Sequence, residues 1–569
     1  MAMADDLGQQ ARINLRIETN DTGTTHALGA GTQINVEQLI YYVSQGSTDL
    51  VADQLLAAGR AEQVEEHPMV VASGIVTVAQ HIGRTLGPAG RRAAVRDAQG
   101  VRHEESTALG IVSVADTEDP RERIGALMMR ELVQQVHQRA GDGSATAAVL
   151  AHHMVIEAIQ VVAEGTHPAV VTRDLRAAGH RAAALLDAVV RPVQNANHIG
   201  ALVRTATGRP EVGRLLGDAV GRVGWQGGLV AQETNTMEYD LQYTSGITID
   251  QGFHSPYFVT DHLSGTAVLD DAYVLVLDQY QPSIYDVLPL LEHVVPTGRP
   301  LLVVADALEE DFLNTLVVNK SRETFKSAAV RVPSQGRQQS ELLADLALAT
   351  GGHVVNRPEL LQRGDLTVLG QARLAVISET FTQLVGTGPD GKQLGKLVTQ
   401  LHKKSQRAAS VEERDWYGYR HAKLSTGAAV LRVGALSEAD LAQRMAAGNK
   451  GISVARGAAR YGYVPGGGVA LLHTRATLLD TLSAAERAQS GWRVLLAALG
   501  QPAASLAENA GHRAEPEALE SFARQGQCFD VLSGRAVPFE EAGILDSAHG
   551  VRTALTSAVE TTARFLDLL

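Results

Sequence analysis

The hydrophobic periodicity of this chain changes twice, and that change constrains the fold more than any other feature. Over Val70–Arg84 the apolar residues recur at spacings of three and four, the pattern of a helix with one buried face. The same rhythm returns in 121–139, 142–164 and 172–190, and again from 434 onward. The two ends of the chain therefore predict one helical domain.

The middle of the chain has a different pattern. Between about 229 and 375, short runs rich in β-branched residues alternate with helical segments. The predicted strands are 274–278, 300–306 and 374–378, and the predicted helices are 283–294 and 309–319. This alternation indicates an α/β domain inserted into the helical one.

The first 58 residues form a third region. Ile13, Leu15 and Ile17 alternate with polar residues, which predicts a strand. Asn35 precedes an apolar run and Gln38 follows three residues later, a spacing typical of a helix start. We therefore expect an N-terminal α+β extension over residues 1–58.

Composition narrows the functional classes. A length of 569 residues suggests two to four domains, and a net charge of −13 gives no electrostatic case for binding nucleic acid or an anionic membrane. A single cysteine, Cys528, fits a reducing compartment. The acidic N-terminus lacks the features of an export signal, and we expect no apolar run long enough to span a bilayer. A cytoplasmic protein is expected.

One glycine-rich segment has the composition of a phosphate site. Gly141–Thr146 (GDGSAT) opens a helix after a break. The glycines let the backbone approach a phosphate, the helix N-terminus presents N–H groups, and Asp142 offers a carboxylate for Mg²⁺. The alternative is that Asp142 or Ser144 only caps the helix and the glycines only make a turn.

Two further glycine-containing segments are ambiguous by themselves. Thr85–Arg91 closes a predicted helix with two glycines around a proline, and Gly466–Gly468 precedes another helix. Each is equally typical of a helix stop or a linker. No glycine–lysine pair is followed by the serine or threonine of a P-loop, which excludes a P-loop ATPase.

Taken together and in this order, these segments resemble the group I chaperonins, the bacterial 60-kDa ring-forming folding proteins. Gly543–Asp546 (GILD) completes the nucleotide series. The likeness covers roughly residues 65–550, and its most specific strings are SPYF at 255–258 and TLVVN at 315–319.

The resemblance implies a multidomain α and α/β fold. An equatorial ATP-binding domain would comprise 59–187 and 450–569, an intermediate domain 188–244 and 373–449, and an apical α/β domain 245–372. The N-terminal extension would be an addition to this plan.

The same resemblance implies a site for ATP and Mg²⁺. Asp142 would bind the metal, and Gly467 and Asp546 would meet the base and ribose. The residues implied to contact the nucleotide are Thr85, Leu86, Gly87, Pro88, Asp142, Gly143, Ser144, Thr146, Gly467 and Asp546.

It also implies an apolar apical groove that binds non-native polypeptides and a lid co-chaperonin. The residues implied to line it are Phe253, Tyr257, Phe258, Leu288, Leu291, Leu313, Val317 and Val318. Their spacing lets the leucines and valines share helix faces, although ordinary core packing is the alternative. His254 stands where the family has an apolar residue.

The departures from the family bear directly on catalysis. Where the family places a catalytic aspartate, about sixteen residues before the glycine triplet, this chain has Lys450, and no acid occurs from Leu441 to Leu479. Ser106–Gly110 likewise lacks a second family acid. Loss of a water-activating acid slows hydrolysis, whereas phosphate binding depends on other atoms. Lys450 could also pair with a phosphate, or simply be a solvated helix residue.

The leading hypothesis is a chaperonin-like protein that binds ATP, hydrolyses it poorly, and holds or helps to fold polypeptides. One alternative is an active ATP-hydrolysing foldase, with a recruited acid or in mixed rings with another chaperonin. Another is a non-catalytic scaffold that acts through residues 1–58. The chain ends at Leu569 without the family's closing strand, so a homo-oligomeric or mixed ring is a hypothesis.

Overall fold

The computed structural model describes residues 68–96, 102–115, 120–224, 227–261, 265–278, 281–332, 336–388, 391–425 and 427–569. The predicted strand around Ile13–Ile17 and the helix after Asn35 lie outside these ranges. Residue packing separates Met1–Val70 from a second compact unit, Val71–Leu569. The architecture below is that of the second unit.

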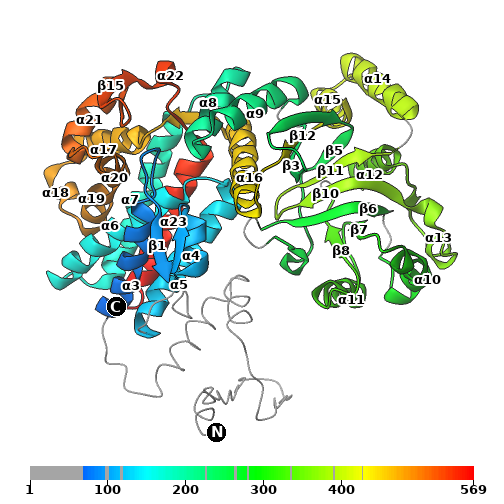
Figure 1. Cartoon of the computed structure of the whole chain (residues 1–569), viewed down its shortest axis with the longest axis horizontal. Coiled ribbons are helices and arrows are strands. Elements are labelled where there is room, and N and C mark those ends of the chain that lie inside the picture. Colours follow the sequence, from blue (N-terminus) through cyan, green and yellow to red (C-terminus); the bar gives the residue numbers. More distant parts are fainter. Residues whose placement is uncertain are drawn as a thin grey trace, which may run out of the picture. The chain divides into compact units, whose positions relative to one another are not determined.

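Helices from both ends of this unit share one hydrophobic core, as the periodicity predicted (Figure 1). The helices from the N-terminal side are α3 (Pro68–Gly83), α4 (Ala108–Val114), α5 (Pro120–Ala140), α6 (Ser144–Ala163) and α7 (Pro168–Ala188). Those from the C-terminal side are α17 (Val469–Thr481), α19 (Ser490–Leu499) and α23 (Ala548–Leu566). Leu150, Leu175, Leu495 and Leu555 are fully buried there.

Helix α6 corrects one expectation from the sequence. It is long and apolar enough, by length and composition, to cross a membrane, although no run of that length was expected. Half of that apolar window is buried inside the protein, and Leu150, Met154 and Val155 lie in the helical core. A buried core helix accounts for its composition.

A seven-stranded mixed sheet forms the middle of the chain, in the order β5-β11-β10-β6-β7-β8 with β9 beside β6. Its strands are β5 (Gly246–Ile249), β6 (Ala267–Leu277), β7 (Leu301–Val304), β8 (Ser327–Val330), β9 (Val354–Val355), β10 (Gly370–Ile377) and β11 (Thr382–Thr387). β6, β7 and β8 are parallel, and their paired segments 273–276, 301–304 and 327–330 are buried, as is typical of parallel strands covered on both faces. The predicted α/β insert is confirmed.

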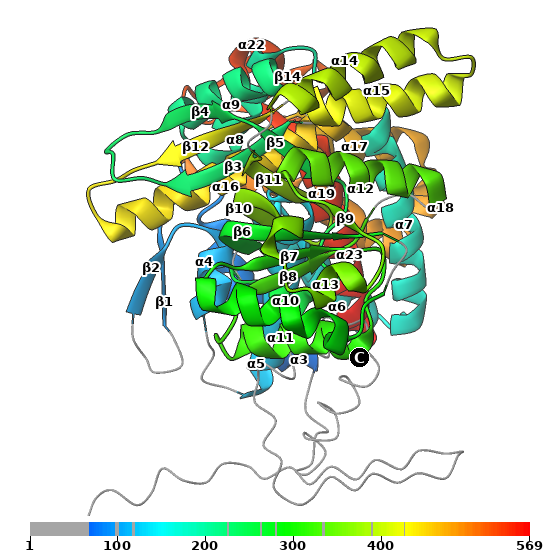
Figure 2. The same ribbon diagram turned by 90° about the vertical axis from the view of Figure 1, so that its right-hand side faces the viewer.

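Helices cover this sheet on two sides. In both ribbon views α10 (Ile284–Val294) and α11 (Glu310–Ser321) lie opposite α12 (Gly336–Thr350), α14 (Gly391–Arg407) and α15 (Val411–Ser425) (Figures 1 and 2). Val287 and Phe312, from the first two helices, are fully buried in the sheet's core.

A smaller sheet, β3-β12-β4, joins the two larger parts. It comprises β3 (Gly228–Glu233), β4 (Asp240–Thr244) and β12 (Ala428–Val433). Helices α8 (Ala196–Thr207), α9 (Pro210–Val223) and α16 (Glu438–Tyr461) contribute to its core.

The expected boundary at residue 373 does not agree with the packing. It falls inside β10, which is hydrogen-bonded to β6 and β11 of the large sheet. Leu401 of α14 and Leu424 of α15 also belong to that sheet's core. The segment from 373 to 425 therefore packs with the apical α/β part rather than with the three-stranded sheet.

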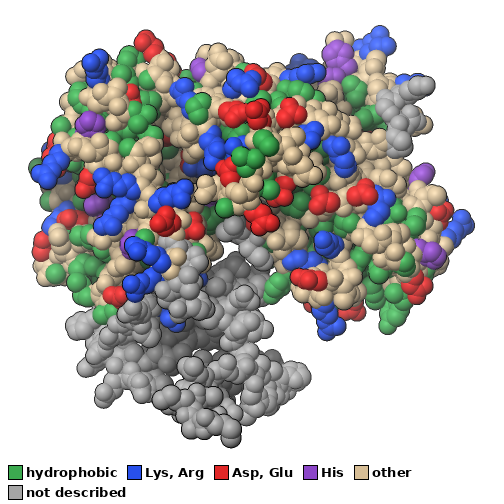
Figure 3. Space-filling view, in the orientation of Figure 1, with side chains coloured by type: hydrophobic (Ala, Val, Ile, Leu, Met, Phe, Trp, Pro, Cys, Tyr) green, Lys and Arg blue, Asp and Glu red, His purple; other side chains and the backbone are tan. Residues whose placement is uncertain are grey.

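The remaining elements are short. They are β1 (Ala93–Arg96), β2 (Arg102–Glu105), α13 (Glu359–Gln362), β13 (Tyr463–Pro465), α18 (Ala484–Arg487), α20 (Gln501–Asn509), α21 (Pro516–Arg524), β14 (Gln527–Asp530), β15 (Arg535–Pro538), α22 (Phe539–Ala542) and β16 (Leu545–Ser547). On the face shown in Figure 3, basic and acidic side chains are interspersed.

Candidate functional site

The break between α5 and α6 is held by two left-handed glycines, Gly141 (φ 70°) and Gly143 (φ 91°), on either side of Asp142. A Cβ on Gly141 would lie 2.2 Å from the Cβ of Ser453 on α16. A Cβ on Gly143 would lie 2.7 Å from the carbonyl oxygen of Gly550 on α23. The loop is thus wedged between two helices, which fixes where the Asp142 carboxylate points.

The N-terminus of α6 suits an anion. Gly143 occupies the N-cap position, and no side chain caps the helix. The first N–H groups of a helix have no partner within it, and the helix dipole favours negative charge there. Thr146 lies half-buried in this first turn. Ser144 donates its hydroxyl to the carbonyl oxygen of Val133 at 3.2 Å, so that hydroxyl is already used within the protein.

Lys450 reaches this loop from the middle of α16. Its Nζ lies 3.0 Å from Oδ1 of Asp142 and donates to the carbonyl oxygen of Ala206 at 2.6 Å. The Lys450 and Asp142 side chains are 34% and 22% exposed, so both can still contact a ligand. Lys450 is therefore a member of the site and not a solvated helix residue.

The glycine triplet and Asp546 meet through a short antiparallel pair. Strands β13 and β16 align Val464 with Asp546. Gly467 (φ 68°) and Gly468 (φ 78°) then turn so that their N–H groups donate to the Asp546 carboxylate. A Cβ on Gly466 would lie 2.9 Å from Ile544, so this turn packs directly against the GILD segment.

Two titratable groups beside Asp142 are perturbed. Burial, and then the negative charge of Asp142, raise the pKa of Asp546 to about 7, although Lys450 and the two glycine N–H groups oppose the shift. Burial, followed by the charge of Lys450, lowers the pKa of His137, at the end of α5. His137 is therefore neutral at pH 7, and Lys450 is the cation that faces Asp142.

The Thr85–Pro88 turn is placed by α20. The side-chain amide of Asn509 donates to the carbonyl oxygens of Gly83 and Leu86 at 2.8 and 2.9 Å. Gly87 (φ 84°) packs so closely on Leu506 that a Cβ would lie 2.2 Å from that side chain. The Thr85 hydroxyl donates to Ile82 at 2.8 Å.

A small apolar pocket adjoins Gly467. Its lining residues are Gly467, Val469, Leu472, Ala503, Leu506, Leu519, Phe529 and Val531. Leu506 is shared with the Thr85–Pro88 turn, so α20 links that turn to the glycine triplet. This pocket is apolar and lies beside both backbone turns.

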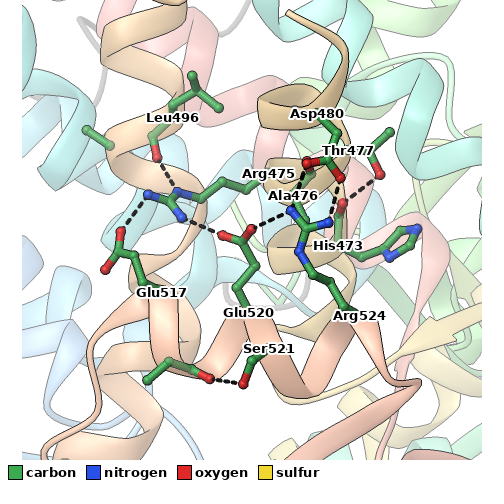
Figure 4. A network of polar contacts seen from close by, with 12 residues as sticks. His473, Arg475, Ala476, Thr477, Asp480, Leu496, Glu517, Glu520, Ser521 and Arg524 are labelled. Atoms are coloured by element: carbon green, nitrogen blue, oxygen red, sulfur yellow. Dashed lines mark hydrogen bonds and ion pairs between the residues drawn. The ribbon is translucent and has the colours of Figure 1, made fainter.

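An ion network holds the pocket walls α17 and α21 together (Figure 4). Arg475 on α17 bonds to Glu520 at 2.5 Å and to Glu517 at 2.7 Å, both on α21. Arg524 bonds to Glu520 at 3.2 Å and back to Asp480 of α17 at 2.5 Å. Leu472 and Leu519, which line the pocket, lie on these same two helices.

The expected magnesium site does not fit the residues present. In nucleotide sites Mg²⁺ is typically bound by one or two free carboxylates together with water and phosphate oxygens, so an accessible Asp142 carboxylate would be needed here. Within the described part of the chain, no group of three or more His, Cys, Asp or Glu side chains is arranged to hold a metal. Asp142 is engaged by the Lys450 ammonium, and Asp546 is engaged by two backbone N–H groups.

Only some of the residues predicted to line the apical groove are exposed. Tyr257, Leu288 and Val318 are 40%, 45% and 43% exposed. Phe253, Leu313 and Val317 are half-buried against the sheet's core. The exposed members lie on or beside α10 and α11.

Two groove predictions need correction. Phe258 is 0% and Leu291 is 8% exposed, and both belong to the core under the sheet. Phe258 ends a short 3₁₀ turn, Pro256–Phe258, which sends Tyr257 outward and Phe258 inward. His254 bonds to the carbonyl oxygen of Ala305 at 3.0 Å, and burial lowers its pKa, so it is a neutral internal residue.

Several site residues were not predicted from the sequence. Ala206 offers only a backbone carbonyl, and Ser453 only a Cβ contact, so neither has a motif. Asn509 lies in a helix whose sequence suggests nothing but packing. The pairing of Lys450 with Asp142 could have been anticipated from their opposite charges.

A family model described as the TCP-1/cpn60 chaperonin family matches residues 78–280 and 285–568. The chaperonin gp146 of bacteriophage EL 2 (Pseudomonas aeruginosa), crystallised in the presence of ATP-BeFx, is similar in fold, at 16% identity and a TM-score of 0.62. The match covers 88% of this chain and 96% of that one. A second crystal form of gp146 gives a TM-score of 0.57 at the same identity and coverage.

Proposed function

This chain belongs to the TCP-1/cpn60 chaperonin family, and from that premise we propose that it binds ATP, hydrolyses it poorly, and holds or helps to fold non-native polypeptides. Membership of the family supports a chaperonin-like role in protein folding. The finer statements, on ATP and its turnover, rest on the site.

Nucleotide binding is supported by the convergence of four separate segments. The uncapped N-terminus of α6, with Thr146 in its first turn, offers N–H groups to phosphates. The apolar pocket beside Gly467 offers a place for the base, and the Thr85–Pro88 turn is anchored next to that pocket through Leu506. Asp546 lies between the two regions and can accept a ribose hydroxyl.

Impaired hydrolysis rests on one observation, the position of Lys450. Its ammonium group, not a carboxylate, lies 3.0 Å from Asp142. An ammonium ion cannot accept a proton from the attacking water, whereas a general base typically contributes about 10²–10⁴ in rate. A cation beside the phosphates stabilises bound ATP without assisting its cleavage.

Polypeptide binding rests on the exposed apolar side chains near α10 and α11. Tyr257, Leu288 and Val318, with Tyr285 at 81% exposure, form an apolar surface on the α/β part. Such a surface suits extended apolar segments of many sequences. A lid co-chaperonin and a ring, made of this chain alone or mixed with another chaperonin, belong to the same proposal.

The test measures ATP binding and phosphate release side by side on the full-length protein, with Mg²⁺ present. We expect ATP to bind and to raise the melting temperature, with phosphate release near background. Phosphate release that Asp142→Ala abolishes would instead identify an active ATPase. No binding at all would favour a scaffold that acts through residues 1–58.

A further inference from the structure

The nucleotide site contains its own cation. Lys450 Nζ lies 3.0 Å from Oδ1 of Asp142, the carboxylate that the family resemblance assigns to a metal ion. A divalent cation placed there would be repelled by the ammonium group at short range. Asp546, a second carboxylate near this pair, is engaged by the N–H groups of Gly467 and Gly468.

The position of Lys450 is fixed by its surroundings. The carbonyl oxygen of Ala206, at the end of α8, accepts a hydrogen bond from Nζ at 2.6 Å. One turn along α16, Ser453 packs against Gly141, which keeps α16 against the loop that carries Asp142. The ammonium group has three donors, and these two acceptors leave one N–H for an incoming phosphate oxygen.

The charges around this loop also favour binding of a phosphate by Lys450 rather than through a metal ion. Asp142 and Lys450 cancel each other, so the net positive potential comes from the uncapped α6 N-terminus beside them. A phosphate group can thus be met by helix N–H groups and one ammonium ion, without a further cation.

We propose that the Lys450 ammonium group takes the place of the divalent cation, so that this site binds nucleotide without Mg²⁺. Lys450 acts as a ligand-binding residue that holds a phosphate oxygen directly. The inference rests on the proposed function, since it concerns the same site. It goes further by making nucleotide binding independent of metal.

The experiment measures ATP affinity of the full-length protein by calorimetry, once with Mg²⁺ and once with excess EDTA. We expect the two dissociation constants to agree within about threefold. Binding that requires Mg²⁺ overturns this inference and leaves the proposed function standing. Absence of binding under both conditions overturns the proposed function and the inference together.

Substitutions of Lys450 test whether its positive charge, rather than the intact fold alone, supports nucleotide binding. Lys450→Gln should lose roughly 10- to 100-fold in affinity in EDTA, the range for one charge-assisted hydrogen bond, and regain part of it when Mg²⁺ is added. Lys450→Arg keeps a cation and should stay independent of Mg²⁺. Lys403→Gln, which removes an exposed lysine of α14, is the matched control and should change nothing.

Asp142→Asn tests the same inference at the carboxylate that Lys450 contacts. If Asp142 were a metal ligand, the variant would lose affinity only in the presence of Mg²⁺. Under the inference it keeps or gains affinity in EDTA, because it removes a negative charge from beside the phosphate. A selective loss with Mg²⁺ overturns the inference even if every variant folds normally.

Discussion

The ammonium nitrogen of Lys450 lies 3.0 Å from a carboxylate oxygen of Asp142, so the residue that the family resemblance assigns to magnesium is paired with a cation of the protein itself. This pair joins α16 to the loop before α6. Lys450, the main departure from the family pattern, therefore lies within the candidate site. Substitutions of this one residue can test both ATP hydrolysis and the need for a metal ion.

Restoring an acid at this position should restore hydrolysis. We expect Lys450→Asp to raise Mg²⁺-dependent phosphate release by roughly 10²-fold over the unmutated protein, because a base beside the γ-phosphate can take the proton of water. Phosphate release by a coupled optical assay measures this. Lys450→Asn is the control, since it removes the lysine without adding an acid. If Asn and Asp variants release phosphate equally, the acid is not what the site lacks.

The pKa of Asp546 predicts a pH dependence of stability. Its folded pKa is raised to about 7, above the ordinary value of 3.8. The destabilisation is therefore absent below about pH 4, grows as the pH rises toward 7, and is constant above it, at roughly 1.4 kcal/mol per pH unit in between. We expect Asp546→Asn to gain stability relative to the unmutated protein between pH 5 and pH 7.5, measured as the difference in melting temperature. An equal difference at both pH values would contradict this.

Substitutions on the apical surface should weaken polypeptide binding without lowering the stability of the protein. Leu288→Ser with Val318→Ser should weaken binding of a denatured, fluorescently labelled protein by about tenfold, since two exposed apolar side chains are removed from the contact. Leu436→Ser removes an 81% exposed leucine at the other sheet and serves as the control. Equal effects from both would show that general surface hydrophobicity, not this surface, binds the polypeptide.

The buried member of the same predicted set should behave in the opposite way. Phe258 is fully enclosed, so Phe258→Ala leaves a cavity and should cost about 3–5 kcal/mol of stability. Urea unfolding of the α/β part, followed by fluorescence, measures this. A variant with unchanged stability and weaker polypeptide binding would place Phe258 on the surface after all.

Phe258 also illustrates what the sequence could supply. The long helices α3, α5, α6 and α7 were predictable because periodic apolar faces repeat over many turns. The string SPYF identified the segment. It could not tell which of its two neighbouring aromatic side chains points inward, because that depends on a 3₁₀ turn set by Ser255.

The same limit explains the domain border and the site. Leu401 of α14 and Leu424 of α15 pack in the core of the large sheet, but their sequences do not reveal which sheet they will cover, so the border at 373 was placed too early. Three of the nucleotide segments were noticed because they contain closely spaced glycines, and Gly543–Asp546 was added through the family resemblance. Asn509 and Ala206 were not noticed, because their roles use an ordinary amide and a backbone carbonyl that only the fold brings near.

The ion network in Figure 4 predicts that substitution of Glu520 lowers stability more than substitution of Glu517. Arg475 contacts both Glu520, whose side chain is 9% exposed, and Glu517, whose side chain is 67% exposed. Glu520 is also bonded to Arg524, so Glu520→Gln leaves two arginines without their shared charge partner. We expect a loss of about 2 kcal/mol for Glu520→Gln, reduced from the fully buried case because both arginines reach solvent.

Glu517→Gln is the matched control, and its exposed ion pair should contribute less than about 1 kcal/mol. Thermal melts of the two variants with and without ATP separate local from ligand-linked effects. Because α17 and α21 carry Leu472 and Leu519 of the apolar pocket, Glu520→Gln should also weaken ATP binding, and Glu517→Gln should not. If both variants bind ATP like the unmutated protein, the network supports the fold but does not set the pocket.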